Sequence, residues 1–320
     1  MSFKDSIAKL LGIEYSYPSV KKELSSFAEQ YKIVKKFEEI DIIIPTYNRI
    51  RETKRTIENL YQSTSIPFKL IIVDNGSTDE TIQYLEALKQ ERQNVKIIFL
   101  KDNPGASTAR SEGLKESKNK YVAFLDNDII TMPYYFENLI ETLEQKGEKV
   151  PGVQSKVVLP NKLIQINYPV LVVDQDLARF FDLDQSKSYN DPSTLETKEC
   201  SWIPIGATLW RRELFDKYSF DKEMGTSYED NDLTFTLHKD GYKFSNCPKA
   251  ICLHLNSEFA PEEKSNSEYQ KGRFGLEGVR NSAKHFFQKH AMFFIYGDIE
   301  GYCRHLGFNS VQEYKDFIKG

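Results

Sequence analysis

The chain has 320 residues, 40% hydrophobic and 28% charged, so it can bury the core of one large α/β domain with additions or of two domains. Its net charge of −4 provides no overall basic field, which argues against nucleic acid as a partner. No apolar stretch approaches the ~20 residues that a membrane-spanning helix needs.

The four cysteines form no C-x-x-C pair, which argues against a zinc site. With no signal peptide in view, we expect reduced thiols in a cytoplasmic protein.

The first 37 residues are interpreted as a helical N-terminal extension. Phe3, Ile7, Leu10 and Leu11 have helical spacing, and a second segment rich in Lys and Glu follows Pro18. We expect it to pack on the main domain, while pairing with another subunit and lying on a membrane surface stay open.

From residue 40 to about 130, strands alternate with helices. The predicted strands are apolar runs at 40–44, 69–73, 95–100 and 121–125, and all but the run at 95–100 are expected to be buried. The Ser77–Glu80 segment has the spacing of a capping box, which predicts a helix from there to about Gln90. This alternation predicts a parallel sheet with right-handed crossovers. The strand exits at 45–49, 74–77, 101–105 and 126–128 should then line one cleft.

Beyond Pro133 the pattern is less regular. We expect strands at 152–158 and 164–173, a loop or lid at 174–199, a short helix at 211–218, a helix from Tyr228 to Gly241, and a strand–turn–strand unit at 242–254. Residues 265–320 are predicted to be largely helical, with a basic aromatic face that includes Lys271, Arg273, Arg280, Lys284, His285, Phe286, Phe287, Lys289 and His290. The most apolar window, Ala291–Tyr296, is too short to span a membrane.

Two carboxylates, Asp126 and Asp128, follow the strand at 121–125. Open α/β sheets bind ligands where their strands end. Carboxylates this close repel each other unless a cation or a proton intervenes, and a divalent ion completed by substrate phosphates would resolve this. The alternative is a simple Asp-Asn-Asp turn, because both residue types favour turns.

The order of these features resembles the nucleotide-sugar glycosyltransferases of family 2, an inverting group with the GT-A fold. The resemblance covers roughly residues 38–256 and rests on motifs in the expected order, Ile42–Arg49, Ile71–Asp79, Asn103–Leu114, Ala123–Asp128, Gly206–Phe215 and Glu229–Leu233. It implies an α/β fold, a Rossmann-like and mostly parallel sheet flanked by helices. The domains would be an N-terminal extension at 1–37, a glycosyltransferase domain at 38–256 and a C-terminal helical region at 257–320.

The resemblance also implies a donor site. Tyr47 would lie against the base, Asp74 would accept hydrogen bonds from the base or ribose, and Arg110 would reach base or phosphate. A turn or cap role for Asp74 and a surface salt bridge for Arg110 are the structural alternatives. Ser111 stands where family members often have Asn. The implied nucleotide-binding set is Pro45, Tyr47, Asn48, Arg49, Asp74, Asn75, Gly105, Arg110, Asp126 and Asn127.

By the same resemblance, Asp126, Asp128 and His254 would bind Mn²⁺ or Mg²⁺ against the diphosphate. Asp230 would be the base that deprotonates the acceptor hydroxyl, with Glu229 as the fallback, because an inverting transfer needs only one base. Capping roles are the alternative for these helix-start carboxylates. The donor sugar and acceptor would be bounded by Trp202, Gly206, Trp210 and Asp232.

The expected function is metal-dependent, inverting transfer of a sugar from a nucleotide sugar, with UDP favoured and dTDP open. The partners would be that donor and a glycan, lipid-linked or protein acceptor; peripheral membrane contact and a homo-oligomer stay open. A sugar-nucleotide pyrophosphorylase is the enzymatic alternative, although the segment Pro45–Arg49 lacks the glycine- and basic-rich signature of that class. A non-catalytic nucleotide-binding module is the other.

Overall fold

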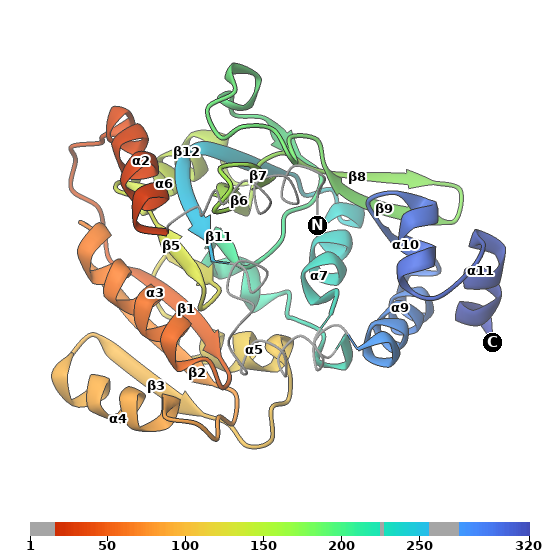
Figure 1. Ribbon diagram of the computed structural model, residues 1–320, viewed down its shortest axis with the longest axis horizontal. Helices are drawn as coiled ribbons and strands as arrows, with labels where there is room; N and C mark the ends of the chain where they lie inside the picture. Colours follow the sequence, from red (N-terminus) through yellow and green to blue (C-terminus); the bar gives the residue numbers. More distant parts are fainter. Residues whose placement is uncertain (1–16, 225–226, 256–274) are drawn as a thin grey trace, which may run out of the picture.

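The computed structural model describes residues 17–224, 227–255 and 275–320 (Figure 1). The predicted apolar helix face of Phe3 to Leu11 lies outside the described residues. The following segment forms helix α2 (Tyr17–Ala28) and the 3-10 turn η1 (Glu29–Tyr31). Val20 and Leu24 of α2 are buried in one cluster with Ile130 and Leu253, so this part of the N-terminal segment packs on the main domain.

The first half of the main sheet alternates strands and helices as predicted. Its parallel strands lie in the order β4, β1, β2, β3. They run parallel because a helix follows each of the first three strands and returns the chain across the sheet. The elements are β1 (Ile40–Thr46), α3 (Ile50–Ser63), β2 (Phe68–Asp74), α4 (Thr81–Glu91), β3 (Val95–Phe99), α5 (Ala106–Glu116) and β4 (Tyr121–Leu125).

The capping-box prediction for α4 is wrong. The helix begins at Thr81, whose backbone N–H donates to the Asp79 carboxylate at 3.0 Å. Ser77 instead accepts a hydrogen bond from the backbone N–H of Asn48 at 2.9 Å. The polar side chain at the end of β2 therefore ties two strand exits together.

The second half makes the sheet mixed rather than mostly parallel. Strand β11 lies antiparallel between β4 and β6, and β6 pairs in parallel with the long strand β12. The predicted 164–173 strand is two strands, and the predicted turn within 242–254 is a register shift inside one strand, between Cys247 and Ile251. The elements are β5 (Ile129–Thr131), α6 (Tyr135–Lys146), β6 (Gly152–Val158), β7 (Ile164–Ile166), β10 (Glu199–Cys200), β11 (Ala207–Arg211), the 3-10 turn η3 (Arg212–Asp216) and β12 (Phe244–His254).

A second sheet contains strand β9, where a loop or lid was predicted. Strands β8 (Pro169–Asp174) and β9 (Leu177–Asp182) form an antiparallel hairpin, and β13 (Phe293–Tyr296) pairs in parallel with β9. Along β9, buried residues alternate with partly buried ones, the pattern of a strand with one covered face. The 3-10 turn η2 (Pro192–Thr194) lies in the rest of the predicted loop.

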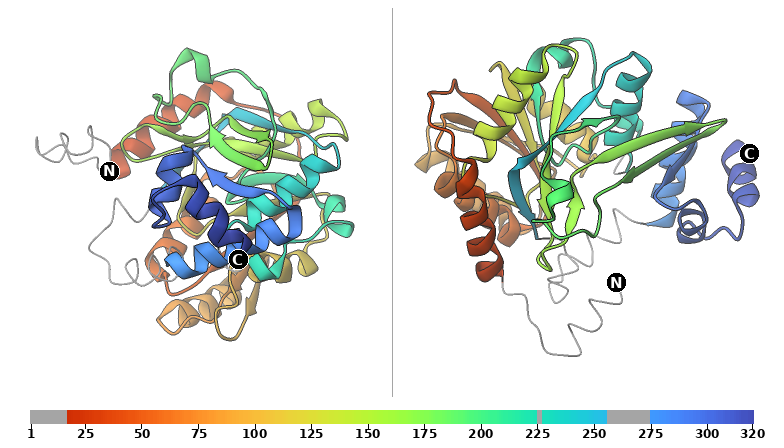
Figure 2. Two further views of the ribbon diagram at one scale, coloured as in Figure 1. Left: turned by 90° about the vertical axis from the view of Figure 1, so that its right-hand side faces the viewer. Right: turned by 90° about the horizontal axis from the view of Figure 1, so that it is seen from above.

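The C-terminal segment shares its core with the main chain instead of forming a separate unit. Phe286 and Phe294 belong to one buried cluster with Phe180, Trp202 and Phe235. Figures 1 and 2 show this segment beside α7, at the end of the molecule opposite α3 and α4. Its neighbours and elements are the 3-10 turn η4 (Lys222–Met224), α7 (Glu229–Lys239), α9 (Leu276–His290), α10 (Ile299–His305) and α11 (Val311–Lys319).

The apolar window at 291–296 is thus mostly strand β13. Across the described ranges, every helix is too short or too polar to cross a bilayer. All four cysteines are buried free thiols.

Candidate functional site

A cavity of about 400 Å³ opens between the end of β4, the start of α7 and the C-terminal segment. A cavity of this size lies within the range typical of small-molecule sites. Six of the predicted site residues line it: Arg110, Asp126, Gly206, Glu229, Asp230 and His254. The other lining residues include Gln154, Gln165, Ser227, Tyr228, Asn231, Val279, Tyr296, Tyr302 and His305.

Arg110 joins the two acidic elements of the cavity. It projects from α5 and donates to Asp126 at 2.9 Å, and its other terminal nitrogen donates to Glu229. Arg110 and Glu229 are both almost fully buried, whereas the Asp126 side chain remains 26% exposed. A planar guanidinium suits this role because it can hold two carboxylates in a fixed geometry.

Asp230 and Glu229 are placed differently, although they are neighbours in the first turn of α7. Glu229 is 3% exposed and paired with Arg110, so its carboxylate is committed to a structural ion pair. Asp230 is partly exposed at the cavity and sits at the helix N-terminus, where the dipole favours the ionised carboxylate. Of the two, Asp230 is therefore the one placed to act as a base.

Gly206 makes room for Asp126. A Cβ atom on Gly206 would lie 2.2 Å from Asp126 Oδ2, so no other residue fits there without moving that carboxylate. The backbone N–H of Asp126 also donates to the Gly206 carbonyl at 2.8 Å. Gly206 thus accepts a hydrogen bond from the backbone of Asp126 and leaves space for its carboxylate.

Asp128 is buried between two cationic or ionisable side chains. Arg49 donates to one carboxylate oxygen at 2.9 Å, and His254 Nε2 lies 3.3 Å from the other. Burial by itself would raise the pKa of Asp128, but His254 and Arg49 hold that pKa well below its usual value. Asp128 is therefore a carboxylate at neutral pH.

The predicted metal ligands come together only in part. Among the residues that the structure describes, no three His, Cys, Asp or Glu side chains form a metal-binding group. Asp128 and His254 are adjacent, and the Nδ1–H of His254 donates to Gln165 Oε1 at 2.6 Å. In a neutral His254 that bond would leave the Nε2 lone pair directed at the Asp128 carboxylate, and a proton or a cation between them would relieve the repulsion. One nitrogen and one oxygen donor fit Mn²⁺ as two of its ligands.

The end of β2 presents buried acceptors without protein partners. Asp74 accepts from the Ser77 backbone N–H through Oδ2, but its Oδ1 has no hydrogen-bond partner among the described residues. The same holds for Oδ1 of Asn75. Buried polar atoms are usually satisfied, so these two acceptors favour a ligand with N–H or O–H donors.

The loops around Asp74 are fixed by hydrogen bonds and by glycine. Asn48, next to Tyr47 and Pro45, accepts from the Thr78 backbone N–H at 2.7 Å. Gly105 precedes α5 with φ of 93°, a conformation that favours glycine. The 45–48 turn, Asp74, Asn75 and Gly105 do not line the cavity described above. Of the predicted nucleotide-binding residues, Arg110 and Asp126 do.

Two predicted donor contacts need correction. The Arg49 side chain is buried and pairs with Asp128 and Asn127. The amide nitrogen of Asn127 donates to Thr46 and Thr53, both at 3.1 Å, so it is committed to the protein interior. Both side chains point back into the fold because the turn after β4 is buried, and they support Asp128 rather than face the cavity.

The predicted contact of Trp202 and Trp210 with the donor sugar and acceptor is also wrong, because both side chains are core residues. Trp202 is 1% exposed and donates to the Phe181 carbonyl, and Trp210 packs against Phe215 and Phe244. Neither lines the cavity.

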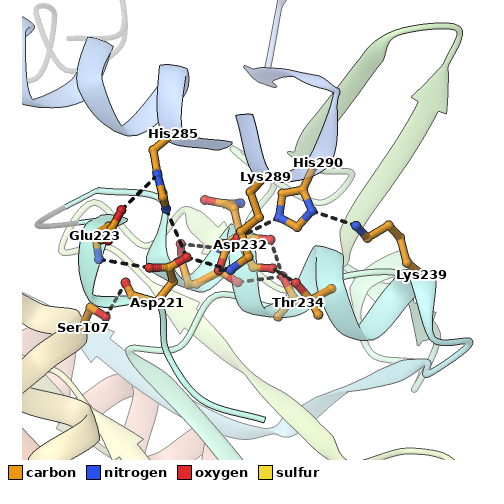
Figure 3. A network of polar contacts seen from close by, with 12 residues as sticks. Ser107, Asp221, Glu223, Asp232, Thr234, Lys239, His285, Lys289 and His290 are labelled. Carbon is orange, nitrogen blue, oxygen red and sulfur yellow. Dashed lines mark hydrogen bonds and ion pairs between the residues drawn. The ribbon is translucent and has the colours of Figure 1, made fainter. Parts of the chain in front are cut away.

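Asp232, predicted to contact the acceptor or orient the turn, is 1% exposed and anchors the C-terminal segment (Figure 3). It accepts from Lys289 and from His290, both at 2.7 Å. Lys289 also donates to Asp221 at 2.8 Å. Lys289 and His290 of the basic C-terminal face therefore dock on α7, whereas Arg280 and Lys284 contact Phe317 within the C-terminal segment. Lys271 and Arg273 lie outside the described residues.

The protonation of His290 follows from its partners. Lys239 donates to Nδ1 at 2.8 Å, so Nε2 carries the proton donated to Asp232. Burial lowers the pKa of His290 below its usual value, with Asp232 opposing this and the charges of Lys239 and Lys289 adding to it.

The sequence interpretation missed the aromatic wall of the cavity. Tyr228, Tyr296 and Tyr302 line it from α7 and the C-terminal segment, and Gln165 orients His254. Tyr228 precedes the acidic helix start and could have been noted, but no sequence pattern distinguishes the other residues.

Residues 41–176 match the family described as glycosyl transferase family 2. The chain carries a family 2 glycosyltransferase domain. An uncharacterized glycosyltransferase of Rickettsia bellii (strain RML369-C) is 35% identical over 32% of this chain and 14% of its own length. The glycosyltransferase GlyG of Streptococcus pneumoniae serotype 4 is 29% identical over 34% of this chain and 35% of its own. The chain thus spans well under two thirds of these relatives.

The family 2 domain has a GT-A fold. The crystal structure of GalNAc-T7 with UDP, GalNAc and Mn²⁺ superposes with a TM-score of 0.55 and 15% identity, covering 89% of this chain and 57% of that one. The family match ends at residue 176, so the α7 carboxylates and the aromatic wall lie beyond it.

Proposed function

We propose that the protein transfers a sugar from a nucleotide sugar to an acceptor hydroxyl with inversion at the anomeric carbon. The observation that carries the proposal is that Asp126, from the end of β4, and Asp230, from the start of α7, line one cavity on a family 2 domain. Asp126 lies at the carboxyl end of a strand, where open α/β sheets bind ligands. Asp230 lies at a helix N-terminus, where the helix dipole favours an ionised carboxylate.

The unsatisfied oxygens of Asp74 and Asn75 would receive N–H and O–H donors of the nucleoside. UDP is the proposed nucleotide, and the fold neighbour GalNAc-T7 was crystallised with UDP. Because these acceptors lie at the β2 exit and Asp126 at the β4 exit, the donor would extend along the carboxyl edge of the sheet.

In the transfer, an acceptor oxygen forms the new bond to the anomeric carbon while the bond from that carbon to the phosphate oxygen breaks. Asp230 takes the acceptor proton, and the nucleoside diphosphate leaves with the electron pair. Arg110 holds Asp126 and Glu229 in place beside this step. Asp128 and His254 would hold a divalent cation, which neutralises the charge of the leaving diphosphate when bound.

The test is a screen of UDP-, dTDP- and GDP-sugars for nucleotide release, with and without Mn²⁺, by the wild type and Asp230→Asn. We expect release from one donor class, a Mn²⁺ requirement, and loss of acceptor-stimulated release in the variant. Absence of release from every donor, with acceptor panels present, would contradict the proposal. The anomeric configuration of the product, read by NMR, tests inversion.

A further inference from the structure

One wall of the cavity is aromatic and is built outside the segment that matches family 2. Tyr296 comes from β13, Tyr302 from α10 and Tyr228 from the residue before α7. These side chains share a cavity with Asp230, the proposed base. The chain therefore uses its C-terminal segment to complete the proposed active site.

The wall is rigid. The Tyr228 and Tyr302 hydroxyls are hydrogen-bonded to each other at 2.7 Å, and the Tyr228 ring stacks on Phe294 with ring centroids 3.9 Å apart. Burial raises the pKa of both phenols, so they stay protonated. Fixed, neutral hydroxyls on an aromatic surface can bind a polar ligand at little cost in side-chain entropy.

Tyr296 is the exposed member of this wall. It is 38% exposed at the end of β13, and Trp202 packs edge-on against it with ring centroids 6.1 Å apart and an interplanar angle of 87°. A surface aromatic held by a core tryptophan, beside the base, is placed to receive the acceptor.

We propose that Tyr296, backed by Tyr228 and Tyr302, forms an acceptor subsite for a sugar ring, so that the acceptor is a saccharide. This inference rests on the proposed function. A pyranose presents a face of C–H groups that packs on an aromatic ring, while its hydroxyls bond to polar groups at the edge. A hydroxyl on the ring would then face Asp230.

The other acceptor classes fit this wall less well. An alkyl chain would displace water from the Asp230 carboxylate and from the tyrosine hydroxyls without offering them a hydrogen bond, at a desolvation cost. A peptide acceptor bound in an extended form is read by hydrogen bonds to a strand edge. Strand β13 does lie at the edge of the second sheet, but what it contributes to the cavity is Tyr296. The wall is made of aromatic residues, the chemistry that packs on a sugar ring.

The experiment measures transfer from the donor found in the nucleotide-release screen to four probes: methyl glycosides of common hexoses, glycerol, a serine-containing peptide and octanol. Tyr296→Ala and Tyr296→Phe are compared with Phe99→Ala, a matched control in which an exposed aromatic (43%) is removed from β3. Nucleotide release to water and the donor KM report whether the donor site is intact.

We expect a methyl glycoside to be the acceptor. Tyr296→Ala should raise its KM about tenfold, while Tyr296→Phe and Phe99→Ala stay within about twofold of the wild type. The donor KM and release to water should be unchanged in Phe99→Ala, and a cooperative thermal unfolding transition close to that of the wild type shows that Tyr296→Ala is folded. Saturation-transfer NMR of the glycoside with UDP present should show ring-proton contacts that Tyr296→Ala loses.

Three outcomes would overturn the inference. Transfer only to the peptide or octanol, or glycoside kinetics unaffected by Tyr296→Ala, would leave the proposed function standing and reject the saccharide subsite. No release from any donor by the wild type would reject the proposed function first, and the subsite with it.

Discussion

Arg110 and Glu229 lie 119 residues apart and form a buried ion pair at the candidate active site. The same guanidinium holds Asp126. One side chain therefore connects the end of β4, on the donor side, to the start of α7, which carries the proposed base. The Glu229 carboxylate is held in this ion pair, whereas the neighbouring Asp230, the proposed base, lines the cavity.

Replacing Arg110 by methionine should destabilise the protein by about 3–5 kcal/mol, because Glu229 would remain as an unpaired buried charge. The double variant with Glu229→Gln should recover most of that loss. Urea unfolding of both single variants and the double variant gives the coupling free energy. Simple additivity of the two changes would contradict the buried pair.

Gly206→Ala should disable the site while leaving the fold intact. The new Cβ would meet Asp126 Oδ2 at 2.2 Å, so that carboxylate must move. Gly278→Ala, in α9 with nothing near its added Cβ, is the matched control and should stabilise by about 0.5–1 kcal/mol. We expect at least a tenfold loss of nucleotide release for Gly206→Ala alone (about 1.4 kcal/mol). Equal activity in both variants would reject the role of Gly206.

Asp230→Asn should lower transfer by about 10²–10⁴-fold and leave UDP binding within about twofold by calorimetry. Glu229→Gln should instead lower thermal stability together with activity, since it breaks the pair with Arg110. If Glu229→Gln alone abolished transfer without loss of stability, the base would be Glu229.

Asp128→Asn and His254→Gln should both weaken Mn²⁺ binding, because these adjacent side chains are the two proposed ligands. Mn²⁺ titration of nucleotide release should show a half-saturating concentration raised about 10–100-fold, in line with loss of a ligand or its support. The readout independent of turnover is Mn²⁺ binding followed by electron paramagnetic resonance. Full activity in the presence of a chelator would remove the metal from the mechanism.

The burial of His290 should make stability depend on pH. The pKa of His290 is lowered in the fold from 6.5, so the unfolded chain binds a proton first as pH falls. The free energy of unfolding should therefore decrease as pH falls below about 6.5. His290→Gln, whose amide can still donate to Asp232, should show a shallower decrease between about pH 7 and 5 in urea unfolding. An unchanged slope would contradict the burial of a neutral His290.

Local sequence was enough for the first half of the fold. Apolar runs predicted β1 to β4, although β3 is a partly exposed edge strand, and parallel connectivity brought their ends to one edge. The association of Asp126 with the later helix start at Glu229 came from the resemblance to family 2, through the order of its motifs. It failed at β9, whose alternating pattern lies in acidic surroundings, and at β13, whose apolar window has no periodicity of its own.

What side chains do in the site was decided by tertiary contacts. The sequence determined that carboxylates gather at strand and helix ends, because those positions follow from period and turn chemistry. Only the folded chain showed that Arg49 supports Asp128, that Asp232 anchors α9 and that Tyr296 faces the cavity. These roles depend on partners 50 or more residues away, and the energy of a buried charge or an exposed ring is set by what surrounds it in space.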